Sequence, residues 1–419
     1  MIKAAEFMVS HGMNADRIDL DLYSKMCCEY MQRGLAEKTD IVPMIPTYLR
    51  GDAQVPKNKK VAVIDAGGTN FRTALVSFTK EGVCFENLQK HSMPGTTEPA
   101  SWDEFISHTA DCVEPLMAET EEIGFCFSYP AEVTKDIDSR VLSLTKQVKI
   151  EGAEGKLLGA DLKKALEGRG VKVSKIVVLN DTPATLLGGS AQLNKSKYGG
   201  FIGMVAGTGV NCCCMVPDKA VSKLGLDGEK RMLINLESGS FDGFFRGDFD
   251  IEMDEALADT GHYIGEKLCS GAYLGELCLR TLKAAANEGV FSEKGRDFIL
   301  GLEFMHSATA DKWGTGKLPK GLCGEDGVNA VYIICELFER AARCMACVLC
   351  GILLLTGEGE GKPVCICVDG SMFNKSKLFR PALEDCMAIY AGEIMERKYE
   401  FVTGEELSLL GSAAAVLLN

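Results

Sequence analysis

Two short segments of the chain share an arrangement in which apolar residues lead directly into a glycine turn. The first is VAVIDAGGTNFR at 61–72, and the second is VAGTG at 205–209. Apolar runs of this length predict buried strands, and glycine permits the positive φ angles and close backbone approach that tight turns need. Such a turn can present backbone N–H groups to an anion such as a phosphate. It can equally be a purely structural connection between two elements.

The polar residues around these turns suit a bound nucleotide. Asp65 ends the first strand, where a carboxylate can face a magnesium ion held by phosphates. A further apolar run, 364–368, also ends in a polar glycine turn. Two halves that each contain a strand and a glycine turn predict two related domains with a nucleotide between them. The turn residues are Asp65, Ala66, Gly67, Gly68, Thr69 and Asn70 in the first turn, Gly207, Thr208 and Gly209 in the second, and Asp369, Gly370 and Ser371 in the third.

Composition narrows the class of protein. The 419 residues, 46% of them hydrophobic, suffice for two or three domains with ample cores. A net charge of −14 argues against nucleic acid or an anionic membrane as the main partner. The 18 cysteines lie largely in apolar runs, which indicates core residues in a reducing cytoplasm. The scattered histidines indicate no metal cluster, and we expect neither a signal peptide nor a membrane span.

The pattern along the chain predicts an α/β fold. Residues 1–50 form an N-terminal segment with a helical stripe that Pro43 and Pro46 end. Short apolar runs then alternate with helical stretches, which is typical of mostly buried sheets. We expect a small domain at 51–185, to which 405–419 returns, and a large domain at 186–404.

Asn180 and Asp181 follow the predicted strand 176–179, at the sheet edge where α/β proteins bind ligands. An aspartate in this place can act as a general base toward a hydroxyl group. The alternative is that Asp181 is only the N-cap of the next helix, since aspartate is a favoured cap.

Further polar residues stand at the ends of other predicted elements. Amides, hydroxyls and carboxylates in such positions could hydrogen-bond the hydroxyls of a sugar. Each of them could also be an ordinary surface or capping group. They are Ser128, Thr145, Lys146, Asn211, Glu237 and Glu266.

Eight motifs in order make a resemblance specific. They extend from residue 64 to 373, and GLAEKTDIVPMIPTYLR at 34–50 lengthens the match to nearly the whole chain. The chain resembles the hexokinase family of the actin-like ATPase superfamily in these segments: IDAGGTNFR, FSYP, LTKQVKIEG, LNDTPATLL, AGTGVN, INLESGSF, EKLCSGAYLGEL and VDGSMF.

The resemblance implies two actin-like ATPase (ribonuclease H-like) domains flanking an interdomain cleft, with ATP and Mg²⁺ as cofactors. Asp181 would be the base that activates the 6-hydroxyl of a hexose, and Lys146 would help neutralise the transferred phosphoryl group. Magnesium would be held by ATP, with Asp65 facing it through water. Closure of the domains would exclude water. The sugar would be held by Ser128, Thr145, Lys146, Asn180, Asp181, Asn211, Glu237 and Glu266, and the nucleotide by Asp65, Gly67, Gly68, Thr69, Asn70, Gly207, Thr208, Gly209, Gly370, Ser371 and Ser412.

Two positions depart from the family pattern. Ser238 follows Glu237, where the family commonly has the Trp of an NTEWG motif. Near the C-terminus, LGSAAA at 410–415 replaces the family's DGSGKGAA and leaves Ser412 as the expected nucleotide contact. Three hypotheses follow: a glucose-phosphorylating hexokinase, a kinase for another sugar such as mannose, fructose or an N-acetylhexosamine, and a non-catalytic sugar-binding regulator on the same fold.

Overall fold

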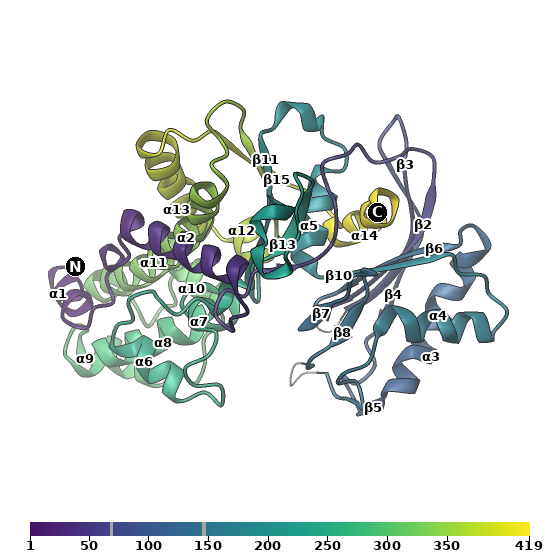
Figure 1. The fold of residues 1–419 in the computed structure, drawn as a ribbon. Coiled ribbons are helices and arrows are strands. Elements are labelled where there is room, and N and C mark those ends of the chain that lie inside the picture. The colour runs from purple at the N-terminus through teal and green to yellow at the C-terminus, as the bar shows by residue number, and fades with distance from the viewer. Residues whose placement is uncertain (68–69, 145–147) are drawn as a thin grey trace.

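A computed structural model describes residues 1–67, 70–144 and 148–419. The chain forms two lobes, each built around its own sheet, with helices α5 (Asp181–Ser190) and α14 (Leu407–Leu418) between them (Figure 1). Gly68, Thr69, Thr145 and Lys146, for which the sequence predicts ligand contacts, lie outside the described residues.

The first lobe contains a five-stranded sheet in the order β10-β6-β2-β3-β4. Three consecutive strands form an antiparallel meander, and two later strands add in parallel beside its first strand. The apolar runs predicted as strands at 61–64, 73–76, 123–127 and 176–179 are confirmed within this sheet. Its strands are β2 (Lys60–Gly67), β3 (Asn70–Phe78), β4 (Val83–Ser92), β6 (Glu122–Phe127) and β10 (Lys175–Leu179).

The second lobe repeats this topology. Its meander is followed by two strands parallel to the first strand of that meander, and β1 adds at the far edge. The same strand order in both lobes agrees with the repeated pattern in the sequence. The sheet consists of β1 (Ile45–Pro46), β11 (Gly200–Ala206), β12 (Val210–Pro217), β13 (Arg231–Asn235), β14 (Val364–Asp369) and β15 (Tyr399–Thr403).

Alternate side chains of a strand point to opposite faces of the first sheet, and each face packs into a different hydrophobic core. Ala62 and Ile64 of β2 face the cluster formed with α3 and α4, whereas Val61 and Val63 face α14. Two small two-stranded ribbons complete this lobe. Its remaining elements are α3 (Trp102–Val113), α4 (Leu158–Gly168), β5 (Ala100–Ser101) paired with β9 (Ile150–Glu151), and β7 (Ala131–Val133) paired with β8 (Ser139–Val141).

The second lobe is mostly helical outside its sheet. The long helix α11 packs along α2 and carries the apolar run 344–356 in its buried part. Residues 1–50 pack on this lobe, because α2 contacts α11 and β1 pairs with β13. The helices are α1 (Ile2–Ser10), α2 (Leu20–Ala36), α6 (Asp248–Glu255), α7 (Ile264–Cys269), α8 (Gly271–Asn287), α9 (Glu293–Leu300), α10 (Ser307–Gly314), α11 (Gly324–Thr356), α12 (Ser371–Lys375) and α13 (Phe379–Met387), with a π-helical turn at Ala388–Ile394. Short 3-10 helices lie at Ala15–Arg17, Glu114–Ala118, Lys195–Lys197, Asp218–Ala220, Ser222–Leu224 and Ser238–Ser240.

Two helices exchange lobes. Helix α5 (Asp181–Ser190) follows β10 of the first sheet but packs on the second sheet, and α14 (Leu407–Leu418) follows β15 of the second sheet but packs on the first. They cross at Gly188 and Gly411, where the backbones lie too close for any side chain. The crossing forms a central core that joins the lobes and sets the start of α5 between the two sheets.

The cysteines are free thiols, and all of them lie in the described part of the chain. Cys212, Cys213 and Cys214 on β12 are fully buried, which confirms their prediction as strand core residues. Among the described residues, no helix has the length and apolar character needed to cross a bilayer.

Candidate active site

The N-terminus of α5 presents Asp181 between the lobes. Strand β10 ends at Leu179, and Asn180 is the N-cap: its Oδ1 accepts hydrogen bonds from the Thr182 backbone N–H (3.2 Å) and hydroxyl (3.1 Å). The capping role therefore belongs to Asn180. Asp181 is the first helical residue, and its Oδ1 accepts a hydrogen bond from the hydroxyl of Thr182 (3.2 Å).

The surroundings of Asp181 change its acidity. Burial raises the pKa of its carboxyl to about 7, and the negative charges of Glu237 and Asp65 act in the same direction, against the hydrogen bond from Thr182. A carboxyl group with a pKa near neutrality is suited to accept a proton from a hydroxyl at physiological pH.

Glu237 lies just beyond the end of β13 and is held by two amides. Its Oε1 accepts hydrogen bonds from the Nδ2 groups of Asn235 (2.7 Å) and Asn211 (3.4 Å). The backbone of Glu237 is in the left-handed region, with φ of 55°. Asn211 also donates to Oδ1 of Asn235 (2.8 Å). Asn235 was not identified as a site residue from the sequence. Its place, a polar residue that ends an apolar strand two positions before Glu237, could have indicated it.

Glu266 approaches from α7. Its Oε2 accepts a hydrogen bond from the backbone N–H of Val210 (3.2 Å), directly after the second glycine turn. Burial raises the pKa of Glu266, and the charge of Asp181 raises it further. Burial likewise raises the pKa of Glu237, with a contribution from the charge of Glu266. The three carboxylates thus repel one another across one region, which favours a ligand that donates hydrogen bonds to them.

A pocket lies against this region and is lined from both lobes. Phe127, Leu179 and Asn180 line it from the first sheet, and Asn235 and Glu237 from the second. Ser128, expected to bind sugar, follows Phe127 at the end of β6, where its backbone N–H donates to the carbonyl of Ala66 (3.1 Å). The structure therefore brings Ser128, Asn180, Asp181, Asn211, Glu237 and Glu266 to the facing ends of the two sheets.

The second glycine turn connects β11 to β12 and packs against two neighbouring segments. Gly207 donates to the carbonyl of Gly209 (2.9 Å), and its own carbonyl accepts from the N–H of Gly271 (2.9 Å). Gly370 follows β14 with φ of 108°, and a Cβ there would lie 2.8 Å from the nitrogen of Gly207. Only glycine fits this position. Gly207, Thr208, Gly209, Gly370 and Ser371 are therefore neighbours, as a shared phosphate and adenosine site requires.

In the first lobe, Gly67 ends β2 and pairs with Asn70, the first residue of β3. Asp65, two residues before Gly67, is buried and forms an ion pair with Arg72. Its Oδ2 also accepts a hydrogen bond from the hydroxyl of Ser408 (3.0 Å). Arg72 bridges further to Glu406. Asp65 is thus neutralised by an arginine and tied to the start of α14.

The structure contradicts the nucleotide contact expected for Ser412. Ser412 is fully buried in α14, its hydroxyl donates to the carbonyl of Ser408 (2.8 Å), and its backbone packs on Gly124 of β6. A side chain enclosed in this way cannot contact a nucleotide, so its role is packing between α14 and the sheet. Three residues that the sequence did not single out connect the start of α14 to Asp65: Ser408 and Arg72 donate to Asp65, and Glu406 pairs with Arg72.

Comparisons with known proteins agree with this architecture. Two family models, both described as hexokinase, match residues 8–191 and 201–418. Hexokinase-2 of Homo sapiens is 31% identical over 394 residues, which is 86% of this chain and 42% of that protein. Hexokinase-1 of Schizosaccharomyces pombe is 27% identical over 420 residues, covering 93% of this chain and 85% of that one. This chain therefore spans less than half the length of the human relative.

Among solved structures, a hexokinase from Schistosoma mansoni complexed with glucose superimposes with a TM-score of 0.78 at 20% identity and covers 99% of both chains. A second crystal structure of a hexokinase gives a TM-score of 0.81 at 20% identity, covering 99% of this chain and 98% of the other. These similarities confirm the predicted fold, two lobes of the actin-like sugar kinase type. Sequence similarity that runs through both lobes, together with this fold, shows that the chain belongs to the hexokinase family.

Proposed function

We propose that this protein is an ATP-dependent hexokinase, which transfers the γ-phosphoryl group of ATP to the 6-hydroxyl of a hexose, with glucose as the preferred sugar. The observation that carries the proposal is the convergence of Asp181, Glu237 and Glu266 from separate elements of both lobes on one region. Family membership and the glucose in the Schistosoma mansoni hexokinase structure support the same reaction.

Asp181 is the proposed general base. Its pKa of about 7 lets the carboxylate accept the proton of the 6-hydroxyl as that oxygen attacks phosphorus. Glu237 and Glu266 accept hydrogen bonds from other sugar hydroxyls, and the amides of Asn180 and Asn211 orient the ring. Ser128, Thr145 and Lys146 complete the proposed sugar contacts, and Lys146 also offsets charge on the transferred group.

The nucleotide lies, in this proposal, between the glycine turns of the two lobes. Gly67, Gly68, Thr69 and Asn70 line the phosphates from the first lobe, and Gly207, Thr208 and Gly209 from the second, because glycine turns allow close backbone N–H contacts. Gly370 and Ser371 contact the adenosine.

Magnesium enters as the MgATP complex. Arg72 and Ser408 already donate to Oδ2 of Asp65, so we propose that Asp65 contacts Mg²⁺ through water and is no direct ligand.

We further propose that residues 51–185 with 405–419 act as the small domain and 186–404 as the large domain, with 1–50 attached to the latter. Closure of the two around hexose and nucleotide would exclude water and limit ATP hydrolysis. The abundance of free cysteines supports a reducing, cytoplasmic location.

The proposal is tested by ADP release with MgATP across a panel of glucose, mannose, fructose and N-acetylglucosamine. We expect glucose-dependent turnover that Asp181→Ala lowers by about a hundredfold to ten-thousandfold. Asp103→Ala, which removes an exposed aspartate on α3, is the matched control and retains full activity. Preference for another sugar would reassign the substrate, and glucose binding without turnover would indicate a regulator.

A further inference from the structure

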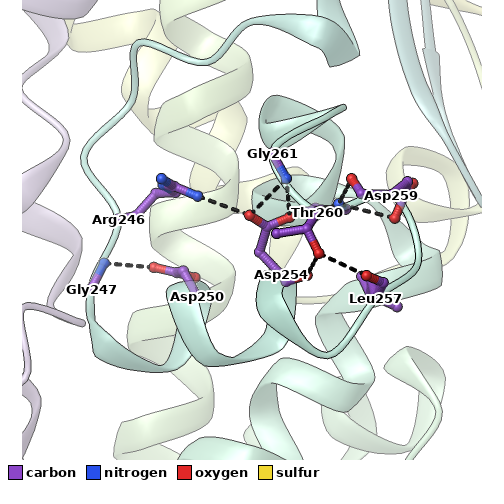
Figure 2. Close-up of polar contacts among 9 residues, drawn as sticks. Arg246, Gly247, Asp250, Asp254, Leu257, Asp259, Thr260 and Gly261 are labelled. Atoms are coloured by element: carbon purple, nitrogen blue, oxygen red, sulfur yellow. Dashed lines mark hydrogen bonds and ion pairs between the residues drawn. The ribbon is translucent and has the colours of Figure 1, made fainter.

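The loop between α6 and α7 closes around a buried carboxylate (Figure 2). Asp254, near the end of α6, accepts hydrogen bonds from the Nη1 of Arg246 (3.1 Å) and the backbone N–H of Gly261 (3.1 Å), as Figure 2 shows. It also accepts a hydrogen bond from the Nζ of Lys267 (2.7 Å). Burial opposes ionisation, but the donors, Lys267 foremost, hold the pKa of Asp254 below its ordinary value. The charged carboxylate of Asp254 therefore holds the two ends of this loop together by hydrogen bonds and an ion pair.

Lys267 is the cation of this cluster. Its side chain is 3% exposed, and its Nζ also contacts the carbonyl (2.9 Å) and the Oδ1 (3.1 Å) of Asp259. A buried ammonium group is tolerated only where several oxygens replace its water, and the carboxylates of Asp254 and Asp259 do so here.

The position of helix α7 depends on the ion pair between Lys267 and Asp254. It has six residues, and a helix of this length is not stable by itself. Consecutive residues on a helix point about 100° apart. While Lys267 points into the cluster, its neighbour Glu266 points to the second glycine turn and accepts from Val210. A rotation of α7 that broke the ion pair would also withdraw the Glu266 carboxylate.

We propose that Asp254 and Lys267 are positioning residues for hexose binding. They fix the rotation of α7 and thereby hold the carboxylate of Glu266 against the sugar, although neither touches the sugar. This inference rests on the proposed hexokinase activity and assigns a function to a charge cluster outside the site itself.

The test compares Lys267→Met and Asp254→Asn with wild type in steady-state kinetics. We expect the KM for glucose to rise about tenfold or more in both variants, because small misplacements of a positioned group are costly. The KM for ATP should change less than the KM for glucose, because the carbonyls of Gly207 and Thr208 accept their hydrogen bonds from Gly271 and Ala272 at the start of α8, and α7 reaches this turn only through the bond from Val210 to Glu266. Lys267→Arg, which keeps the charge, restores part of the loss.

A matched control removes another buried ion pair from the same helix. Arg340 of α11 and Asp250 of α6 are paired at 2.6 Å with both side chains at most 2% exposed. Arg340→Met breaks polar contacts to Asp250 and Met13 and none to Lys267, Asp254 or Glu266, so we expect its KM for glucose to stay at the wild-type value although the fold is destabilised.

A double-mutant cycle separates positioning from general damage. In a Glu266→Gln background, Lys267→Met should raise the KM for glucose no further, because its effect passes through Glu266. Additive effects of the two substitutions would overturn the inference. An unchanged KM for glucose in Asp254→Asn would overturn it as well, even if Lys267→Met fails to fold. Folded wild-type protein without turnover on any hexose would instead overturn the proposed function.

Discussion

The crossing of α5 and α14 leads to a quantitative prediction for Gly411→Ala. A Cβ on Gly411 would lie 2.6 Å from the Cα of Ala184, well inside the 3.4 Å at which ordinary contact begins. The obstacle is backbone, which cannot rotate away like a side chain, so the two helices must separate by on the order of 1 Å within a close-packed core.

The expected magnitude combines two opposing effects. Overpacking of a core costs about 1–3 kcal/mol, and a backbone clash belongs at the upper end of this range. Replacing a helical glycine by alanine returns about 1 kcal/mol through helix propensity. We therefore expect Gly411→Ala to lower the free energy of unfolding by about 2 kcal/mol. Activity should fall as well, because α5 carries Asp181 at its first position.

Gly168→Ala is the matched control. Gly168 is also helical, at the end of α4, but a Cβ there meets nothing within 4 Å. The same chemical change should thus stabilise the protein by about 0.5 kcal/mol. Urea midpoints followed by circular dichroism measure both effects. A midpoint for Gly411→Ala at or above that of wild type would refute the close approach of the helices.

Three further predictions follow from the site and the core. The kcat/KM for glucose should rise with pH through about 7 and then level off, because Asp181 acts as a base only when ionised and burial raises its pKa to about 7; a midpoint near the ordinary aspartate value of about 4 would contradict this. Arg72→Met should lower the free energy of unfolding by about 2 kcal/mol, since buried Asp65 loses a charged donor; an unchanged urea midpoint would count against the ion pair. Alkylation of the native protein should modify Cys84 and Cys323 first, because these are the exposed thiols; early labelling of a buried cysteine in peptide mass spectra would show otherwise.

Much of the local structure could be predicted from the sequence, since its causes are local. The apolar runs before the glycine turns became β2, β11 and β14, and Asn180 and Asp181 stand where a strand meets a helix. Burial of an apolar strand and the φ freedom of glycine depend on a few consecutive residues. The order of the eight motifs also indicated the family, and with it the expected roles of carboxylates such as Glu237 and Glu266.

Only the tertiary structure decided which residues meet across the chain. Arg72 and Glu406 are 334 positions apart, and nothing in either local sequence indicates their pairing. Ser412 occupies the motif position expected to contact the nucleotide, yet the packing of α14 on β6 buries it. Likewise, the local sequence does not distinguish Lys267, beside Glu266, from an ordinary surface charge. It is buried only because the loop that follows α6 folds over it. Burial and ion pairing depend on elements distant in sequence, so the polar residues that hold the site in place emerge only from the folded chain.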